Sequence, residues 1–206
     1  MVRLACTISI FLLHVTTSFA EDSKAYPAKQ PNGWDFLKED VTLYLVARNY
    51  DLYGDNKTDC LISKTVSKDN QSHKLSQELH FKNTSGSQWY KGIVNMTAYR
   101  DDHGVYNFMN TTTGARYNFL YTDGECGVVE VLYNNHIKSS PTTSSTNDTK
   151  RSNEGRLCAI WVTEGALSKA HDDCWHSFRC ECDNKSIYPA FNRTECKNRA
   201  DTETRN

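Results

Sequence analysis

A segment reading DDCWHSFRCEC holds side chains that can bind a metal, exchange electrons or form disulfides. Cys174, Cys180 and Cys182 lie within nine positions, and His171 and His176 lie beside them. A structural zinc site needs four ligands, commonly supplied as paired motifs such as C-x-x-C. Cys180-Glu-Cys182 lacks that spacing, and the chain has no C-x-x-C or H-x-x-x-H motif. We therefore expect no metal here, and we expect both histidines on the surface of a short helix.

A second polar group, Asp101, Asp102 and His103, could serve in acid–base chemistry or bind a metal. Gly104 follows directly, however, and Asp-Asp-His-Gly is above all a turn sequence. The chain contains no G-x-S-x-G, no H-E-x-x-H, no phosphate-binding glycine loop and no Cys–His pair in a recognisable catalytic setting. We therefore expect neither an enzyme nor a bound cofactor.

The N-terminus indicates the compartment. Residues 1–20 place Arg3 before an apolar run and end on small residues up to Ala20, which predicts a secretory signal peptide cut after Ala20. A transmembrane anchor needs about 20 consecutive apolar residues, and His14 interrupts the run. We therefore expect a secreted, extracellular protein with no membrane contact after cleavage. Cys6 leaves with the signal peptide, so seven of the eight cysteines remain, an odd number.

Sequons for N-glycosylation are spread along the whole chain, as expected for an extracellular surface. In an oxidising compartment cysteines pair with one another, so disulfides are the expected role of the cysteine-rich segment. The eight expected glycosylation sites are Asn56, Asn70, Asn83, Asn95, Asn110, Asn147, Asn184 and Asn192.

Charge and length narrow the classes further. The chain has 24 Lys and Arg against 25 Asp and Glu, so no basic field would attract a phosphate backbone, and nucleic acid is not an expected partner. No Pro/Gly-rich linker divides the chain. We therefore expect a single domain over residues 21–206, with a polar C-terminal tail.

Period-two patterns of branched and aromatic residues predict eight short strands. Tight turn sequences at 101–104, 113–114 and 123–124 favour antiparallel pairing. A capped helical turn is expected at 32–39, with Trp34 and Leu37 facing the interior, and one late helix at about 168–181. The polar segment 139–155 is expected to be a flexible loop before the last strand. The expected strands are 41–50, 60–68, 73–82, 88–99, 105–109, 115–122, 127–133 and 157–162.

Eight antiparallel strands and one late helix fit an all-β fold, an up-and-down barrel with room for one small ligand. A β-sandwich is the structural alternative. If Asn95 carries a glycan and points outward, strand alternation turns Tyr90, Gly92, Val94 and Met96 toward the interior. That face is apolar and aromatic.

The order of several short motifs resembles the salivary lipocalins of ticks, the histamine-binding protein family with its japanin-like relatives. The motifs are W-x-x-L-K-x-D with one spacing irregularity near residues 34–40, F-K-N at 81–83, G-E-C ending at Cys126, C-A-I-W-V at 158–162, D-D-C ending at Cys174, and Y-P-A-F-N-R-T-E-C at 188–196. The resemblance covers most of the mature chain. It implies an eight-stranded lipocalin barrel.

The resemblance also implies disulfide pairs. Cys60 would pair with Cys196 and Cys126 with Cys174, while Cys158 would pair with either Cys180 or Cys182, and the sequence leaves that choice open. One thiol is left over. We expect it to be buried and inert; capping a small molecule or linking two chains are the alternatives. We accordingly expect a monomer, with a disulfide-linked dimer as the alternative.

Members of this family sequester host mediators such as biogenic amines, leukotrienes, fatty-acid products or cholesterol. Amine capture needs buried carboxylates as counter-charges. The positions where amine-binding relatives place acids or acid-flanking residues fall here on Gly92, Tyr117 and Ala159, and of the expected acids only Asp51 remains. The resemblance therefore implies capture of an uncharged or amphipathic lipid.

Biogenic-amine scavenging and binding of a host immune protein, such as a complement or dendritic-cell modulator, are the alternative functions. Any barrel also has to fill its interior, so each candidate ligand-binding residue has a packing role as its alternative. The candidate ligand-binding residues are Tyr44, Tyr50, Asp51, Tyr53, Tyr90, Val94, Met96, Tyr117, Phe119 and Trp161.

Overall fold

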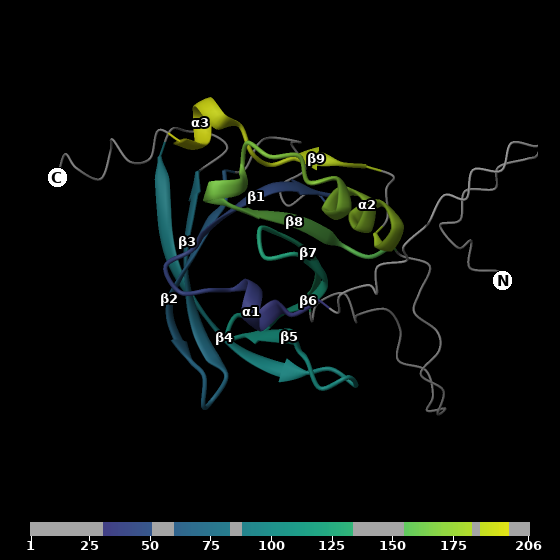
Figure 1. Cartoon of the computed structure of the whole chain (residues 1–206). Helices are drawn as coiled ribbons and strands as arrows, with labels where there is room; N and C mark the ends of the chain where they lie inside the picture. Colours follow the sequence, from purple (N-terminus) through teal and green to yellow (C-terminus); the bar gives the residue numbers. More distant parts are fainter. Residues whose placement is uncertain (1–30, 51–59, 83–87, 134–154, 183–185, 198–206) are drawn as a thin grey trace, which may run out of the picture.

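The structure, a computed structural model, is a closed antiparallel β-barrel of eight strands (Figure 1). It describes residues 31–50, 60–82, 88–133, 155–182 and 186–197. Consecutive strands pair, and β1 pairs with both β8 and β2, which closes the barrel. The eight are β1 (Thr42–Arg48), β2 (Ile62–Asp69), β3 (Lys74–Lys82), β4 (Trp89–Arg100), β5 (Tyr106–Thr111), β6 (Ala115–Thr122), β7 (Cys126–Tyr133) and β8 (Cys158–Thr163). The predicted barrel is therefore confirmed, and the sandwich alternative is wrong.

Short turns gather at one end of the barrel. They join β2 to β3, β4 to β5 and β6 to β7. Gly104 and Gly124 adopt left-handed backbone conformations with φ of 80° and 95°, as these turns require. Residues 51–59, 83–87 and 134–154, which connect other strands, lie outside the described residues. The expected loop at 139–155 lies almost wholly outside them too, as do the expected signal peptide and the expected C-terminal tail.

A single helical turn, α1 (Gly33–Phe36), closes the turn-bearing end. Asn32 caps it, because its side-chain oxygen accepts a hydrogen bond from the Asp35 amide at 3.1 Å. The turn buries Trp34 and Phe36, and it packs so tightly that a Cβ on Gly33 would lie 2.2 Å from the Phe119 ring. The expected interior position of Trp34 is thus confirmed, and α1 acts as a plug.

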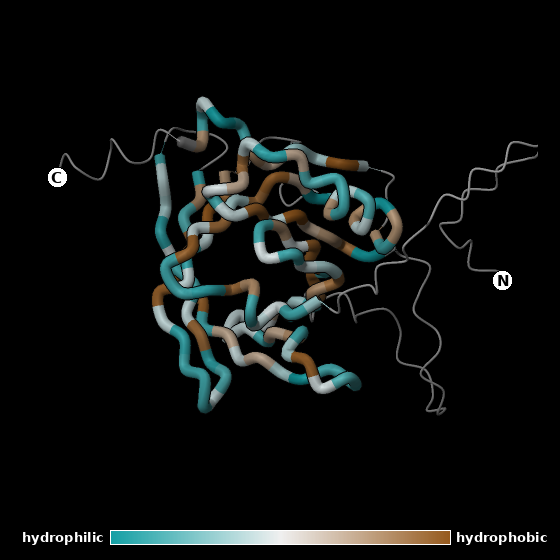
Figure 2. The backbone as a smooth tube through the Cα atoms, in the orientation of Figure 1, coloured by the Kyte–Doolittle hydropathy of each residue, from teal (hydrophilic) through white to brown (hydrophobic). Residues whose placement is uncertain are grey.

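The late helix, α2 (Asp172–Glu181), packs on the outside of the barrel against β6, β7 and β8 (Figure 1). It starts four residues later than expected and buries Cys174 and Phe178. A short 3-10 turn, η2 (Glu164–Ala166), precedes it. In Figure 2, strongly hydrophobic segments run along β1 and β8, which lie between the barrel interior and the outer elements.

Three disulfides fix the outer elements to the barrel. They are Cys60–Cys196, Cys126–Cys174 and Cys158–Cys182. The two implied pairs are confirmed, and the structure selects Cys182 as the partner of Cys158. Cys180 is the free cysteine of the described chain.

The C-terminal segment completes the barrel wall in a way the sequence analysis did not predict. A two-residue strand, β9 (Tyr188–Pro189), pairs with the end of β1, and a short helix, α3 (Arg193–Lys197), follows. The Ala190 amide donates to Val46 of β1, and its carbonyl accepts from the Cys60 amide just before β2. The segment therefore bridges β1 and β2 where these two strands separate.

Candidate ligand-binding site

The barrel encloses a small, mainly apolar cavity of about 70 Å³. Inward-facing side chains of α1 and of all eight barrel strands converge on it. Its apolar lining consists of Phe36, Leu37, Leu43, Leu61, Leu79, Met96, Met109, Tyr117, Phe119, Val129 and Trp161. Met96, Tyr117, Phe119 and Trp161 belong to the predicted set.

Two polar side chains interrupt this lining. Ser63 of β2 and Gln77 of β3 face the cavity and are 5% and 1% exposed. Ser63 Oγ donates to Gln77 Oε1, and Gln77 Nε2 donates to Thr65 Oγ1 at 2.6 Å. Each buried polar group therefore has a partner, as a low-dielectric interior demands.

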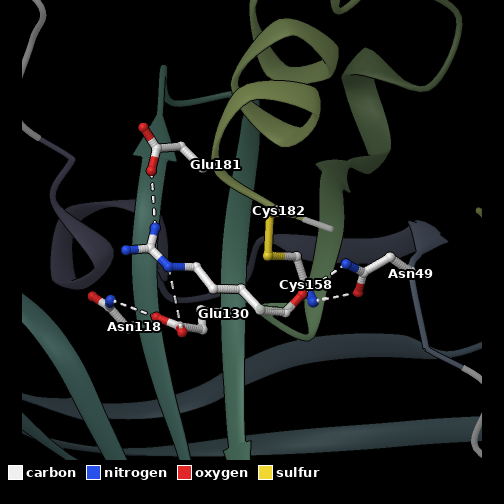
Figure 3. Close-up of polar contacts among 7 residues, drawn as sticks. Asn49, Asn118, Glu130, Cys158, Glu181 and Cys182 are labelled. Carbon is white, nitrogen blue, oxygen red and sulfur yellow. Dashed lines mark hydrogen bonds and ion pairs between the residues drawn. A yellow bond between two sulfur atoms is a disulfide. The ribbon is translucent and has the colours of Figure 1, made fainter. Parts of the chain in front are cut away.

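No acidic side chain lines the cavity among the described residues. The buried carboxylate in that part of the chain is Glu130 of β7, next to the cavity-lining Val129 and hence on the opposite face of the strand. Glu130 accepts from Asn118 Nδ2 at 3.0 Å and lies 3.7 Å from Arg156 Nε, and Arg156 also donates to Glu181 at 2.9 Å (Figure 3). This carboxylate therefore stabilises the junction of barrel and α2.

The upper part of the inner wall carries an aromatic pair. Phe81 and Tyr90 face each other on β3 and β4, and their rings stack with centroids 5.6 Å apart. Both are partly exposed, at 36% and 39%. Below them Gly92 lies opposite Leu79, and a Cβ on Gly92 would meet no atom within 4 Å. Free space therefore lies on the inner face between the aromatic pair and the cavity.

The closed end is held by a partly buried lysine. Lys68 Nζ lies 4.3 Å from the Trp34 ring centroid and donates to the carbonyls of Trp34 and Leu37 at 2.6 and 3.1 Å. Burial lowers the pKa of Lys68, and the charges of Asp35 and Glu39 partly oppose that shift. Lys68 therefore fixes α1 at the base rather than facing the cavity.

Of the remaining predicted residues, two lie on the expected face. Val94 lies opposite Gln77 and packs against the buried apolar residues inside the barrel. Tyr90 lies opposite Phe81, near the end of the inner wall. Tyr50 packs against the cluster of Leu45, Ala159 and Ala190, with the Arg48 guanidinium 5.9 Å from its ring. Asp51 and Tyr53 lie outside the described residues. Whether any of these residues binds a ligand stays a prediction.

The expectation for Tyr44 is wrong. Tyr44 pairs with Ile62, whereas its neighbour Leu43 pairs with the cavity-lining Ser63, so Tyr44 points away from the interior. Its ring packs edge-on against Phe191 with centroids 5.3 Å apart. The C-terminal segment covers the outer face of β1, and both faces of that strand are consequently buried.

Sequence reasoning also missed cavity residues. Leu75, Leu79 and Phe81 share one face of the expected strand 73–82, and Gln77 lies at the intervening position of the same alternation. That pattern could have identified it. Ser63 and Leu61 had no comparable signal, because alternation in their strand is weak.

A larger hollow of about 760 Å³ lies along β2 to β5, and most of the residues that line it are polar. Lys74, Ser76 and Thr97 line it together with Asn95 and Asn110, two of the expected glycosylation sites. Asn70, Asn95 and Asn192 are exposed and Asn110 is half-buried. Glycans at Asn95 and Asn110 would occupy this hollow, so we do not assign it to a ligand. The other four sequons, at Asn56, Asn83, Asn147 and Asn184, lie outside the described residues.

The histidines and cysteines at 171–182 form no metal-binding cluster in the structure. Cys174 and Cys182 are consumed by disulfides, and no group of three potential ligands occurs in the described ranges. Cys180 Sγ lies 3.6 Å from His176 Nε2 on α2. Cys180 is the leftover thiol and is half-buried, so the expectation that this thiol is buried is wrong.

The family profile "Tick histamine binding protein" matches residues 20–198. The chain belongs to this family. No curated protein matches it in sequence. Among solved structures, japanin from Rhipicephalus appendiculatus bound to cholesterol is similar with a TM-score of 0.51 and 13% identity over 78% of this chain and 97% of that one.

Two further lipocalin-like structures are similar to this member of the tick histamine-binding family. A bovine odorant-binding protein triple mutant has a TM-score of 0.47 and 11% identity over 79% of this chain and 97% of that one. The siderocalin Ex-FABP has a TM-score of 0.48 and 12% identity over 74% and 91%. At such identity the japanin match shows the lipocalin fold. Among the described helices, none combines the length and apolarity of a membrane-spanning segment.

Proposed function

We propose that the protein is a secreted lipocalin that sequesters a small hydrophobic or amphipathic host molecule in its barrel and so modulates host inflammatory and immune responses. One observation carries the proposal: the cavity wall is apolar and has no acidic side chain among the described residues. Such a wall favours burial of apolar ligand surface, worth roughly 25 cal/mol per Å². The cholesterol in the japanin structure is consistent with this ligand class.

The size of the cavity limits how a ligand enters. Pockets for drug-sized ligands occupy about 300–1,000 Å³, and this cavity measures about 70 Å³. A sterol or fatty acid would therefore also fill the space over Gly92 and displace flexible wall residues. Met96 and Met109 suit this role, because unbranched thioether side chains repack at low cost.

The second candidate, an amine scavenger, is suggested by the family to which the chain belongs. Moving an ammonium group into an apolar interior without a counter-charge costs several kcal/mol. The described cavity wall supplies no such charge, since Glu130 faces outward. Amine capture would thus depend on acidic residues outside the described part of the chain, such as Asp51.

A host immune protein as partner is the third candidate. It would engage the outer surface rather than the cavity, and glycans at the exposed Asn70, Asn95 and Asn192 would cover part of that surface. A lipid bound inside the barrel does not need this outer surface to be uncovered.

The test is mass spectrometry of the protein secreted from eukaryotic cells, both under native conditions and after solvent extraction. A co-purified lipid in about equimolar amount supports the proposal. Tight binding of histamine or serotonin by calorimetry would overturn it. Absence of both lipid and amine binding would also overturn it and indicate a protein partner.

A further inference from the structure

The polar pair Ser63–Gln77 is unusual because the rest of the cavity lining is apolar or aromatic. An interior position of a barrel strand is filled most cheaply by an aliphatic side chain, and burying an amide costs free energy unless all its hydrogen bonds are formed. Gln77 is 1% exposed and is flanked on its own strand face by Leu75 and Leu79. An amide at that position therefore invites a functional explanation.

The Gln77 amide has hydrogen-bonding capacity left over. It has two N–H donors and two acceptor lone pairs. Within the described chain, Oε1 accepts from Ser63 Oγ and one N–H of Nε2 goes to Thr65 Oγ1. One N–H and one lone pair thus remain, and Gln77 lines the cavity. A ligand group that both donates and accepts one hydrogen bond would match this capacity.

A carboxylate or an ammonium head group would find no counter-charge beside Gln77 among the described residues of the lining. The described cavity lining contains no Lys or Arg to neutralise a carboxylate and no Asp or Glu to neutralise an ammonium group. An unpaired ion in an apolar interior is strongly disfavoured relative to water. A neutral hydroxyl avoids that cost and still satisfies the amide.

From this geometry we infer that Gln77, positioned by Ser63 and Thr65, is the recognition site for a neutral hydroxyl group on an otherwise apolar ligand. The ligand enters with its hydroxyl first. Gln77 lies deeper on β3 than Leu79 and Phe81, so the apolar body of the ligand extends past Leu79 and the open space over Gly92 to the Phe81–Tyr90 pair. The inference rests on the proposed function and narrows it to uncharged lipid alcohols.

The test uses probes with one tail and four ends: 1-dodecanol, 1-chlorododecane, dodecylamine and dodecanoate. Each probe is titrated to displace the neutral fluorophore N-phenyl-1-naphthylamine from the full-length secreted protein at pH 7. The measured affinities are then corrected for each probe's free energy of transfer from water to an apolar solvent. We expect the alcohol to bind about tenfold more tightly than the chloride, because the chloride leaves the buried amide unsatisfied. We expect both ionic probes to bind at least about tenfold more weakly than the alcohol.

Variants assign the preference to Gln77. Gln77→Met keeps an unbranched side chain and should reduce the alcohol-to-chloride ratio to about one while chloride binding persists. Leu167→Met makes a similar apolar change outside the cavity lining and should keep the ratio. Ser63→Ala removes one of the two groups that position the Gln77 amide and should lower the alcohol-to-chloride ratio without abolishing it, which provides a test even if Gln77→Met does not fold.

The outcomes separate the two proposals. If all neutral probes bind but the wild type shows no alcohol preference, or if Gln77→Met retains that preference, or if Ser63→Ala leaves it unchanged, the hydroxyl site is refuted and lipid capture stands. Tightest binding by dodecanoate or dodecylamine likewise refutes the site. If no probe binds, the hydroxyl site and the proposed lipid function fall together.

Discussion

Gly92 is the residue at which the predicted ligand path can be blocked with least damage to the fold. A Cβ there would meet no atom within 4 Å, so Gly92→Leu should fold normally and fill the space between Leu79 and the Phe81–Tyr90 pair. We expect lipid-probe affinity to fall at least about tenfold, with unfolding stability changed by less than about 1 kcal/mol. Fluorophore displacement and urea unfolding measure the two.

Gly165 provides the matched control for this prediction. It is exposed in η2, and a Cβ there also meets no atom within 4 Å. Gly165→Leu should leave probe affinity unchanged. Equal affinity for Gly92→Leu and the wild type would show that ligands do not pass over Gly92.

Glu130 should matter for stability and not for ligand capture. It is 2% exposed, and Glu130→Ala removes the acceptor of Asn118 and the ion-pair partner of Arg156. We expect a loss of about 1–3 kcal/mol in the free energy of unfolding, measured with urea. Glu181→Ala removes an exposed partner of the same arginine and should cost less than about 1 kcal/mol. A similar loss in both variants would contradict this assignment.

Individual residues were predictable where alternation was clean and one face of a strand was exposed. Met96 and Phe119 follow that rule and line the cavity as expected. Tyr44 violates it, because the segment around Phe191 covers the outer face of β1 and both faces of that strand are buried. The orientation of Glu130 was likewise hidden, since the partner that accounts for it, Arg156, lies 26 positions along the chain.

At the scale of elements, a hydrogen-bond chain ties the β4–β5 turn to the α1 plug. Asp101 accepts from the amides of His103 and Val105 and from Asn107 Nδ2, and Asn107 Oδ1 accepts from the Gly33 amide at 3.1 Å. Although burial raises the pKa of Asp101, these hydrogen bonds outweigh it and hold that pKa below its ordinary value. The plug therefore depends on an ionised turn residue.

This dependence gives a pH prediction with a definite sign. A carboxyl with a lower pKa in the folded than in the unfolded state stabilises the fold above the unfolded pKa, near 4, and loses that contribution as pH falls through the folded pKa. The stability difference between the wild type and Asp101→Ala should be full at pH 7 and should shrink below about pH 4. Urea unfolding from pH 7 to 2.5 measures it. Asp102→Ala, at the exposed neighbour, should show a smaller difference, and a gap that widens in acid would contradict the assignment.

Element prediction succeeded for the eight strands and α1, because turn residues and period-two patterns bounded them. It failed for β9 and α3. Tyr188–Pro189 is too short to show alternation, and proline normally argues against a strand. The proline is tolerated because it lies at the end of a two-residue strand, and the pairing that defines β9 comes from β1, about 140 residues earlier in the chain.

At the scale of the whole molecule, the three disulfides close loops of very different length. Cys60–Cys196 spans 136 residues, and Cys158–Cys182 spans 24. Loop-closure entropy assigns them about 5 and about 3.5 kcal/mol, respectively. We therefore expect Cys60→Ser combined with Cys196→Ser to lower the free energy of unfolding more than Cys158→Ser combined with Cys182→Ser. Urea unfolding of both double variants decides the order, and the reverse order would show that the link between α2 and β8 dominates.

The position of β9 has a consequence for biogenesis. The seam between the upper halves of β1 and β2 is sealed by residues that are made after all eight long strands, and Cys60 emerges 136 residues before the cysteine with which it bonds. A nascent chain that has already formed all eight long strands still has a gap in its wall. Oxidative maturation of this protein therefore cannot finish before Cys196 has been made, and termination before residue 188 leaves an open seam however well the other strands have assembled.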